Sequence, residues 1–264
     1  MIKRIKAVFK IITEKRLTTV AGAWVYYFLA SVIPIAFLLV TAFGVFGVSV
    51  SNELVARLPD EFRNAGEVIA STAENASKSV TVFFVITVVF SCTTLLNQMS
   101  KDGDFIYGAK SKTKRGVMRR IWALFALASL FFAFLGAAFL FAFWNVIFEG
   151  VTQGGIYKLF ITIMAFFLII LFAYGVIILL NGFISPIRLT FKQISLGALF
   201  SLFIIVLGTI YFTVYLRFFA NYNAFYGSLA GIVVFLLWAY IVMLGLASGV
   251  IVNMKLYEKN IINT

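Results

Sequence analysis

Long uncharged stretches separated by charged connections dominate the chain. Six such stretches contain at least 22 residues each, and they cover 24–52, 79–100, 121–148, 159–187, 193–216 and 218–254. A helix needs about 20 mostly apolar residues to cross the hydrocarbon core of a bilayer. The pattern predicts an all-α polytopic membrane protein, a single domain over 1–264 with six transmembrane helices. We place these spans at about 24–48, 80–99, 121–148, 156–183, 194–215 and 226–253.

Two further helices are predicted outside these spans. Within 2–18, apolar residues recur at helical spacing with lysines and arginines between them. This favours an amphipathic helix on the inner leaflet, with docking of a partner as the alternative. In the connection 49–78, Pro59 precedes two acidic residues, which suits a helix N-terminus. We expect a short external helix there, and a gating role for it is the alternative.

Composition supports a membrane protein. Hydrophobic residues make up 62% of the 264 residues and charged residues 12%, which excludes a soluble α/β enzyme. The chain has no histidine, so imidazole metal sites, Ser-His catalysis and histidine proton relays are excluded. The single cysteine, Cys92, can form no intramolecular disulfide. We therefore expect no metal site and no cofactor.

The net charge of +12 indicates how the chain is oriented in the membrane, and it is not by itself evidence of an anionic ligand. Of the 22 basic residues, 17 lie in the N-terminal segment, the second and fourth connections and the C-terminal tail, and five lie in the other connections. Because positively charged loops stay on the cytoplasmic side, both termini are predicted to be cytoplasmic. We expect anionic lipid head groups as partners of the basic loops, and we expect no nucleic acid.

Proline and polar side chains within the spans mark candidate functional positions. Pro34 is expected to kink or break the first span near Ala30, since proline removes a backbone hydrogen bond. Broken helices often line a cavity, although a purely structural kink is the alternative. The second span ends in polar residues that either join helices or face an aqueous path. Gly245 and Gly249 have the spacing that allows close helix contact.

Charged and aromatic residues near the membrane boundaries complete the candidate set. Arg188 lies at the inner boundary beside Pro186, where it either binds a phosphate or carboxylate or extends to the lipid head groups. Asp102 and Asp104 lie among seven basic residues and suit a solvated loop better than a metal site. The candidate substrate-binding residues are Tyr27, Ser31, Pro34, Asn97, Gln98, Arg188, Tyr215, Asn221, Asn223 and Tyr226.

Several segments resemble the YihY/BrkB family of bacterial inner-membrane proteins, which includes virulence factors and proteins formerly labelled ribonuclease BN. The similar segments are Tyr26 to Ser31 followed by Pro34, Leu96 to Gln98, Ser185 to Arg188, Ser195 to Ala198, Asn221 to Ala230, and Trp238 to Tyr240. The resemblance implies a six-helix membrane fold and no transferable catalytic residues. The family tail usually carries a glutamate, and this chain has Gly249-Val-Ile-Val-Asn253 there, without an acid.

A transporter or flippase for an amphiphilic or anionic substrate, such as a lipid-linked envelope precursor, is the favoured function. The alternative is a non-transporting membrane scaffold in envelope integrity. Metal-assisted phosphodiester cleavage needs clustered carboxylates or histidines, and the acidic residues here are scattered over both predicted sides. We therefore expect no enzyme activity, and a multi-pass location in the bacterial inner membrane.

Overall fold

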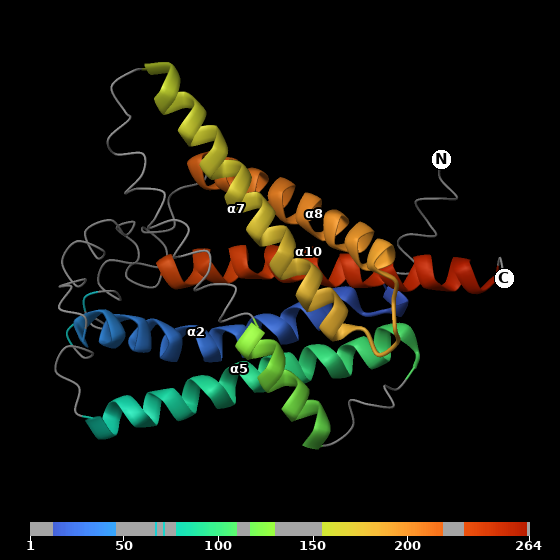
Figure 1. The fold of residues 1–264 in the computed structure, drawn as a ribbon, viewed down its shortest axis with the longest axis horizontal. Coiled ribbons are helices and arrows are strands. Elements are labelled where there is room, and N and C mark those ends of the chain that lie inside the picture. Colours follow the sequence, from blue (N-terminus) through green and yellow to red (C-terminus); the bar gives the residue numbers. More distant parts are fainter. Residues whose placement is uncertain are drawn as a thin grey trace. The chain divides into compact units, whose positions relative to one another are not determined.

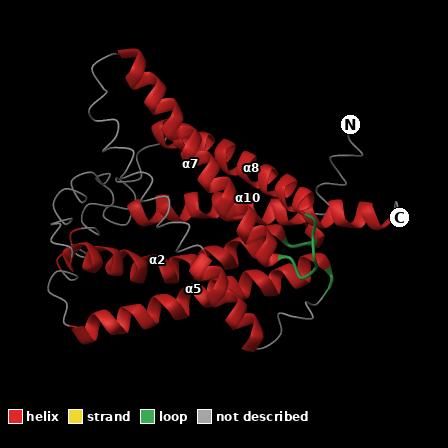
Figure 2. Cartoon of the chain, viewed as in Figure 1, coloured by secondary structure: helices red, strands yellow, loops and turns green. Residues whose placement is uncertain are grey.

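Helices form all the regular structure that the computed structural model describes, which comprises residues 13–45, 67, 71, 78–109, 117–129, 155–218 and 230–262. Figure 2 shows helices and connecting loops alone in these ranges. The labelled helices in Figure 1 are α2 (Leu17–Val45), α5 (Lys78–Tyr107), α7 (Gly155–Ile184), α8 (Phe191–Phe218) and α10 (Ala230–Ile262). Residues 117–129 are also helical. Long apolar segments favour helices because hydrocarbon offers the backbone no hydrogen-bonding partner.

Four of the described helices are long and apolar enough to cross a membrane. These candidate spans are Ser79–Tyr107, Phe166–Ile184, Phe191–Leu216 and Ile232–Lys259. They correspond to the second, fourth, fifth and sixth predicted spans. Leu17–Val32 is a shorter apolar helix that overlaps the start of the first predicted span. Most of the third predicted span lies outside the described residues, so six spans remain a prediction.

The helix boundaries differ from the predicted spans at several ends. The first helix starts at Leu17 instead of about residue 24, after a turn at Lys15 and Arg16, where Arg16 has a φ of 47°. The predicted amphipathic helix therefore does not continue to residue 18, while 2–12 lie outside the described residues. In the connection 49–78 Glu67 and Ser71 are helical, and the remainder of 49–77 is outside the described residues, so the short external helix stays a prediction.

Pro34 does not interrupt α2. The helix continues from Leu17 to Val45 through the proline, so the predicted break is wrong, while the alternative kink stays a prediction. One turn before it, the Ser31 hydroxyl donates to the carbonyl oxygens of Phe28 at 2.7 Å and Tyr27 at 3.3 Å. Serine hydroxyls commonly bond to the preceding turn in this way. The polar group is thus satisfied inside the helix.

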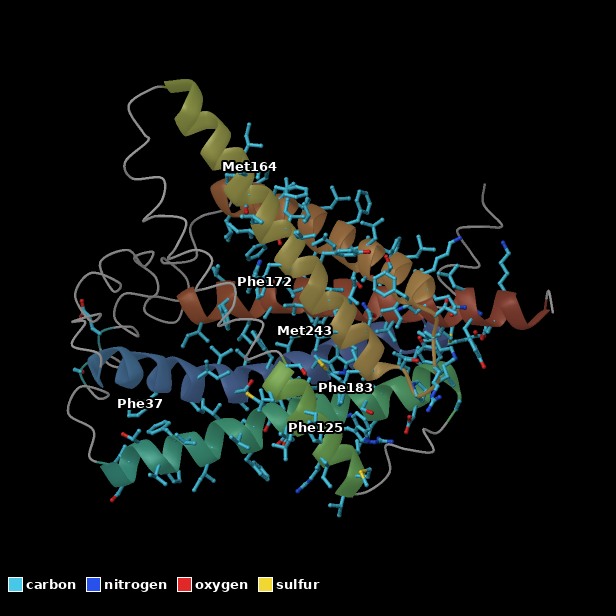
Figure 3. All side chains as sticks on the ribbon, in the orientation of Figure 1. Phe37, Phe125, Met164, Phe172, Phe183 and Met243 are labelled. Atoms are coloured by element: carbon cyan, nitrogen blue, oxygen red, sulfur yellow. The ribbon has the colours of Figure 1, made fainter. Side chains whose placement is uncertain are left out.

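The chain divides into two compact units, Met1–Met99 with Ile205–Ala247 and Ser100–Ile204 with Ser248–Thr264. In the first unit α2 packs against α5 through Phe37 and Phe84, whose ring centroids lie 3.7 Å apart. Figure 3 shows Phe37 on the side of α2 that faces α5. Phe28 of α2 stacks on Phe235 of α10 at 6.2 Å. Aromatic contacts therefore join α2 to α5 and to α10 within this unit.

Candidate functional site

The candidate residues of the first unit lie on α2, α5 and α8. Ser31 and Pro34 are buried, and Tyr27, Asn97, Gln98 and Tyr215 are partly buried. Ser31 also contacts the Cys92 thiol of α5. The structure thus brings Ser31 of α2 to α5, but it does not join all of these residues in one contact. Asn221, Asn223 and Tyr226 lie outside the described residues.

Arg188 belongs to the second unit, in the loop between α7 and α8. The loop forms because Pro186 cannot continue α7, and because Ser185 closes a turn. The Ser185 amide donates to the Asn181 carbonyl oxygen at 3.2 Å, and its hydroxyl donates to the Ile187 carbonyl oxygen at 2.8 Å. This turn leaves Arg188 exposed between two apolar candidate spans.

The start of α8 is fixed by a side chain that returns to the backbone. Gln193 Oε1 accepts hydrogen bonds from the Thr190 amide at 2.9 Å and the Thr190 hydroxyl at 3.0 Å. This is the reach-back half of a capping box, which satisfies a donor at the helix start. Gln193 is buried and the neighbouring Lys192 is exposed. Lys192 therefore adds a second exposed cation close to Arg188 in sequence.

Asp104 lies in a helix and forms a buried ion pair, so the prediction of a solvated loop is wrong. α5 continues to Tyr107, and Asp104 Oδ2 accepts a hydrogen bond from Arg119 of the helix 117–129. The two side chains are 15% and 10% exposed. A buried charge is tolerated when it is paired. Arg119, which belongs to the basic connection between the second and third predicted spans, is thus buried in this unit.

Asparagine side chains are buried without partners at two positions of the second unit. Asn181 of α7 is 1% exposed and Asn253 of α10 is 0% exposed. Among the described residues, neither the Nδ2 nor the Oδ1 atom of either asparagine has a hydrogen-bond partner. Polar groups in a membrane interior are costly, and they often mark substrate or ion pathways. The sequence signal was available, since Asn181 interrupts an apolar stretch, but the predicted set omitted both.

Close contact between α8 and α10 surrounds Asn253. A Cβ atom at Gly197 would overlap the Asn253 amide, and one at Gly249 would overlap the Ser201 hydroxyl and the Gly197 carbonyl oxygen. Gly249 therefore has the close-packing role that its spacing predicts. Tyr174 joins α7 to α8, since its hydroxyl donates to the Ser195 carbonyl oxygen at 3.1 Å. Three helices of the second unit thus meet around polar groups.

The comparison with protein families covers nearly the whole chain. The virulence factor BrkB family matches residues 8–261. The chain belongs to this family. This confirms the resemblance carried by the segments around Pro34, Arg188 and Asn223.

Similarity to a curated membrane protein supports this BrkB assignment. The chain is 24% identical over 233 residues to the UPF0761 membrane protein MS0032 of Mannheimia succiniciproducens, and the match covers 85% of the chain and 79% of the relative. No solved structure matches the chain. Membership of the BrkB family and the four apolar helices together establish a membrane protein, and the family assigns no reaction to it.

Proposed function

We propose that this BrkB-family protein is an inner-membrane transporter or flippase for an amphiphilic substrate with an anionic group, such as a lipid-linked envelope precursor. The observation that carries the proposal is the exposure of Arg188 in a short loop between two apolar candidate spans. A guanidinium binds phosphate or carboxylate through two parallel hydrogen bonds. An anionic head group that reaches this loop would meet the exposed Arg188 guanidinium.

The charges around Arg188 support an anionic partner. Lys192 is exposed in the first turn of α8, beside Gln193, whose Oε1 accepts hydrogen bonds from the Thr190 amide and hydroxyl at the start of that helix. The N-terminus of a helix carries a partial positive charge, which also favours an anion. Anionic lipid head groups of the inner leaflet are therefore the proposed partners, and the protein carries out no covalent reaction on them.

Leaflet exchange in vesicles tests this function. Purified protein is reconstituted with a fluorescent anionic lipid, and a membrane-impermeant quencher reports the fraction of lipid that reaches the outer leaflet. We expect the wild-type protein to accelerate exchange and Arg188→Gln to slow it about tenfold. That factor corresponds to the loss of one charge-assisted interaction of about 1.5 kcal/mol.

Lys101→Gln is the matched control. Lys101 is exposed near the end of α5, so its substitution removes the same charge from another connection. Exchange by this variant should equal that of the wild-type protein. Absence of exchange of any anionic lipid by the wild-type protein would reject transport and leave the scaffold function. Equal slowing by both substitutions would reject a specific role for Arg188.

A further inference from the structure

The part of α8 that belongs to the second unit, residues 191–204, has two faces of different character. Gly197 lies on the face that contacts α10, where a Cβ atom would overlap the Asn253 amide. On the opposite face, exposed residues recur three or four positions apart, as they do along one side of a helix. We call this exposed row the α8 stripe, and its members are Lys192, Leu196, Leu199 and Phe203.

The apolar side chains of the α8 stripe point away from the rest of the protein. Leu196, Leu199 and Phe203 are 45%, 54% and 58% exposed. Lys192 and Phe203 are 11 positions apart, and at about 1.5 Å per residue this is roughly 16 Å along the helix. Half of the hydrocarbon core of a bilayer is about 15 Å thick. The stripe therefore has the depth of one leaflet, which an acyl chain also has.

Two cations lie at the start of the stripe. Arg188 in the loop before α8 and Lys192 in the first turn of α8 are both exposed. The hydrogen bonds of Ser185 and Gln193 fix the two ends of this loop. Residues 184–204 contain no aspartate or glutamate, so no acid of this segment neutralises the two cations. A guanidinium and an ammonium at the end of a lipid-facing helix favour an anionic head group.

The cations and the apolar stripe together select one kind of ligand. A free phosphate would bind the cations, but it gains nothing from apolar side chains. A zwitterionic lipid would cover the stripe, but its head group has no net charge and gains less from Arg188 and Lys192. An anionic phospholipid uses both features, because its phosphate meets the cations while an acyl chain covers the apolar side chains.

We propose that α8 binds one anionic phospholipid on the face opposite α10. Its phosphate lies at Arg188 and Lys192, and one acyl chain follows Leu196, Leu199 and Phe203 into the leaflet. Binding of this lipid does not depend on transport. Its role as the substrate rests on the proposed function, and the inference then names the substrate class as an anionic phospholipid.

Native mass spectrometry of the full chain, released from detergent micelles, tests the site because it counts the lipids bound to each protein. The protein is titrated with dioleoyl phosphatidylglycerol, or with dioleoyl phosphatidylcholine, which has the same chains and no net charge. We expect one saturable phosphatidylglycerol, and a Kd about tenfold higher for phosphatidylcholine. Dihexanoyl phosphatidylglycerol has the same head group and short chains, and it should also bind about tenfold more weakly. Inorganic phosphate should not compete.

Lys192→Gln tests the head-group end of the site. It should raise the Kd for dioleoyl phosphatidylglycerol about fivefold, because it removes one of the two cations. Lys101→Gln is the matched control, since Lys101 is exposed near the end of α5 and its substitution removes the same charge elsewhere. This control should bind the lipid like the wild-type protein.

Phe203→Ala tests the acyl-chain end of the site. It should raise the same Kd about threefold, because it shortens the apolar contact with the chain. Phe167→Ala on α7 is the matched control, since Phe167 is 59% exposed and lies on another helix. The substituted side chains are all exposed, so the variants should fold, and equal Tm values check this.

Equal affinity for phosphatidylglycerol and phosphatidylcholine would overturn the site. An unchanged Kd in both Lys192→Gln and Phe203→Ala, or equal weakening by their controls, would do the same. Competition by inorganic phosphate would assign the two cations to a free anion and overturn the lipid as ligand. Saturable phosphatidylglycerol binding by a protein that exchanges no lipid would keep this inference and reject only transport.

Discussion

Gly103 is the residue at which α5 approaches the end of α7 most closely. A Cβ atom there would overlap the carbonyl oxygen of Ile184, and it would also lie 3.0 Å from the Ile184 carbonyl carbon. Backbone atoms cannot rotate away as a flexible side chain can. The glycine is therefore required by the approach of two backbones, which the hydrophobic pattern of the chain does not reveal.

Gly103→Ala should lower the free energy of unfolding by about 2 kcal/mol, because overpacking forces the two backbones apart. Gly175→Ala in α7 is the control, since a Cβ atom there meets nothing within 4 Å. Alanine is favoured over glycine in a helix interior by about 1 kcal/mol, so this control should be neutral or more stable. Unfolding in detergent micelles measures both, and equal destabilisation would contradict the close approach.

At the scale of helices, the Asp104–Arg119 pair joins the C-terminal end of α5 to the helix 117–129. Asp104→Asn removes the charge of the carboxylate that pairs with the buried Arg119, and should destabilise the protein by about 3–5 kcal/mol. Replacement of both residues by Leu and Met should recover most of this loss, because it removes both buried charges. Unfolding of Asp104→Asn and of the double variant measures both effects.

Glu258→Gln is the control for the ion pair. Glu258 and Lys255 are both 46% exposed, so loss of that pair should cost about 0–1 kcal/mol. If Asp104→Asn costs no more than this control, the pair is not held in a buried position in the membrane.

The sequence predicted where the helices lie along the chain better than it predicted the residues at which they end. Apolar length defines the part of a helix that lies in hydrocarbon, and the fourth span, predicted at 156–183, corresponds to Gly155–Ile184. A helix continues wherever its backbone hydrogen bonds do, so α5 and α10 extend to Tyr107 and Ile262, beyond the predicted ends at 99 and 253.

Partners of polar residues were harder to predict than their positions. The sequence places Asp104 among several basic residues. Its partner, Arg119, is 15 residues away, so the path of the chain between the two residues decides which basic residue pairs with it. Arg188 was predicted at a boundary and is exposed in a loop there. The environment of Asn253 depends on Gly197, which is 56 positions away in sequence. Spacing within a single helix carries no information on such a contact.

At the scale of the whole molecule, the distribution of basic residues predicts the orientation. Seventeen basic residues lie in the connections and termini assigned to the cytoplasm and five in the others. Translocation of positively charged loops across the membrane is disfavoured, so the excess of basic residues in these connections should place both termini in the cytoplasm. Lys259, near the end of α10, and Glu67, in the first external connection, are both exposed and lie on opposite predicted sides.

Cysteine substitutions at these two positions test the orientation. Cys92, the one native cysteine, is buried, so the unmodified chain should react little with a membrane-impermeant maleimide. In intact spheroplasts Glu67→Cys should be labelled and Lys259→Cys protected, and in inside-out vesicles the pattern should reverse. Labelling of Lys259→Cys from outside would contradict a cytoplasmic C-terminus. Since Arg188 and Lys259 lie in connections assigned to the same side, that result would also move the proposed anion contact to the outer leaflet.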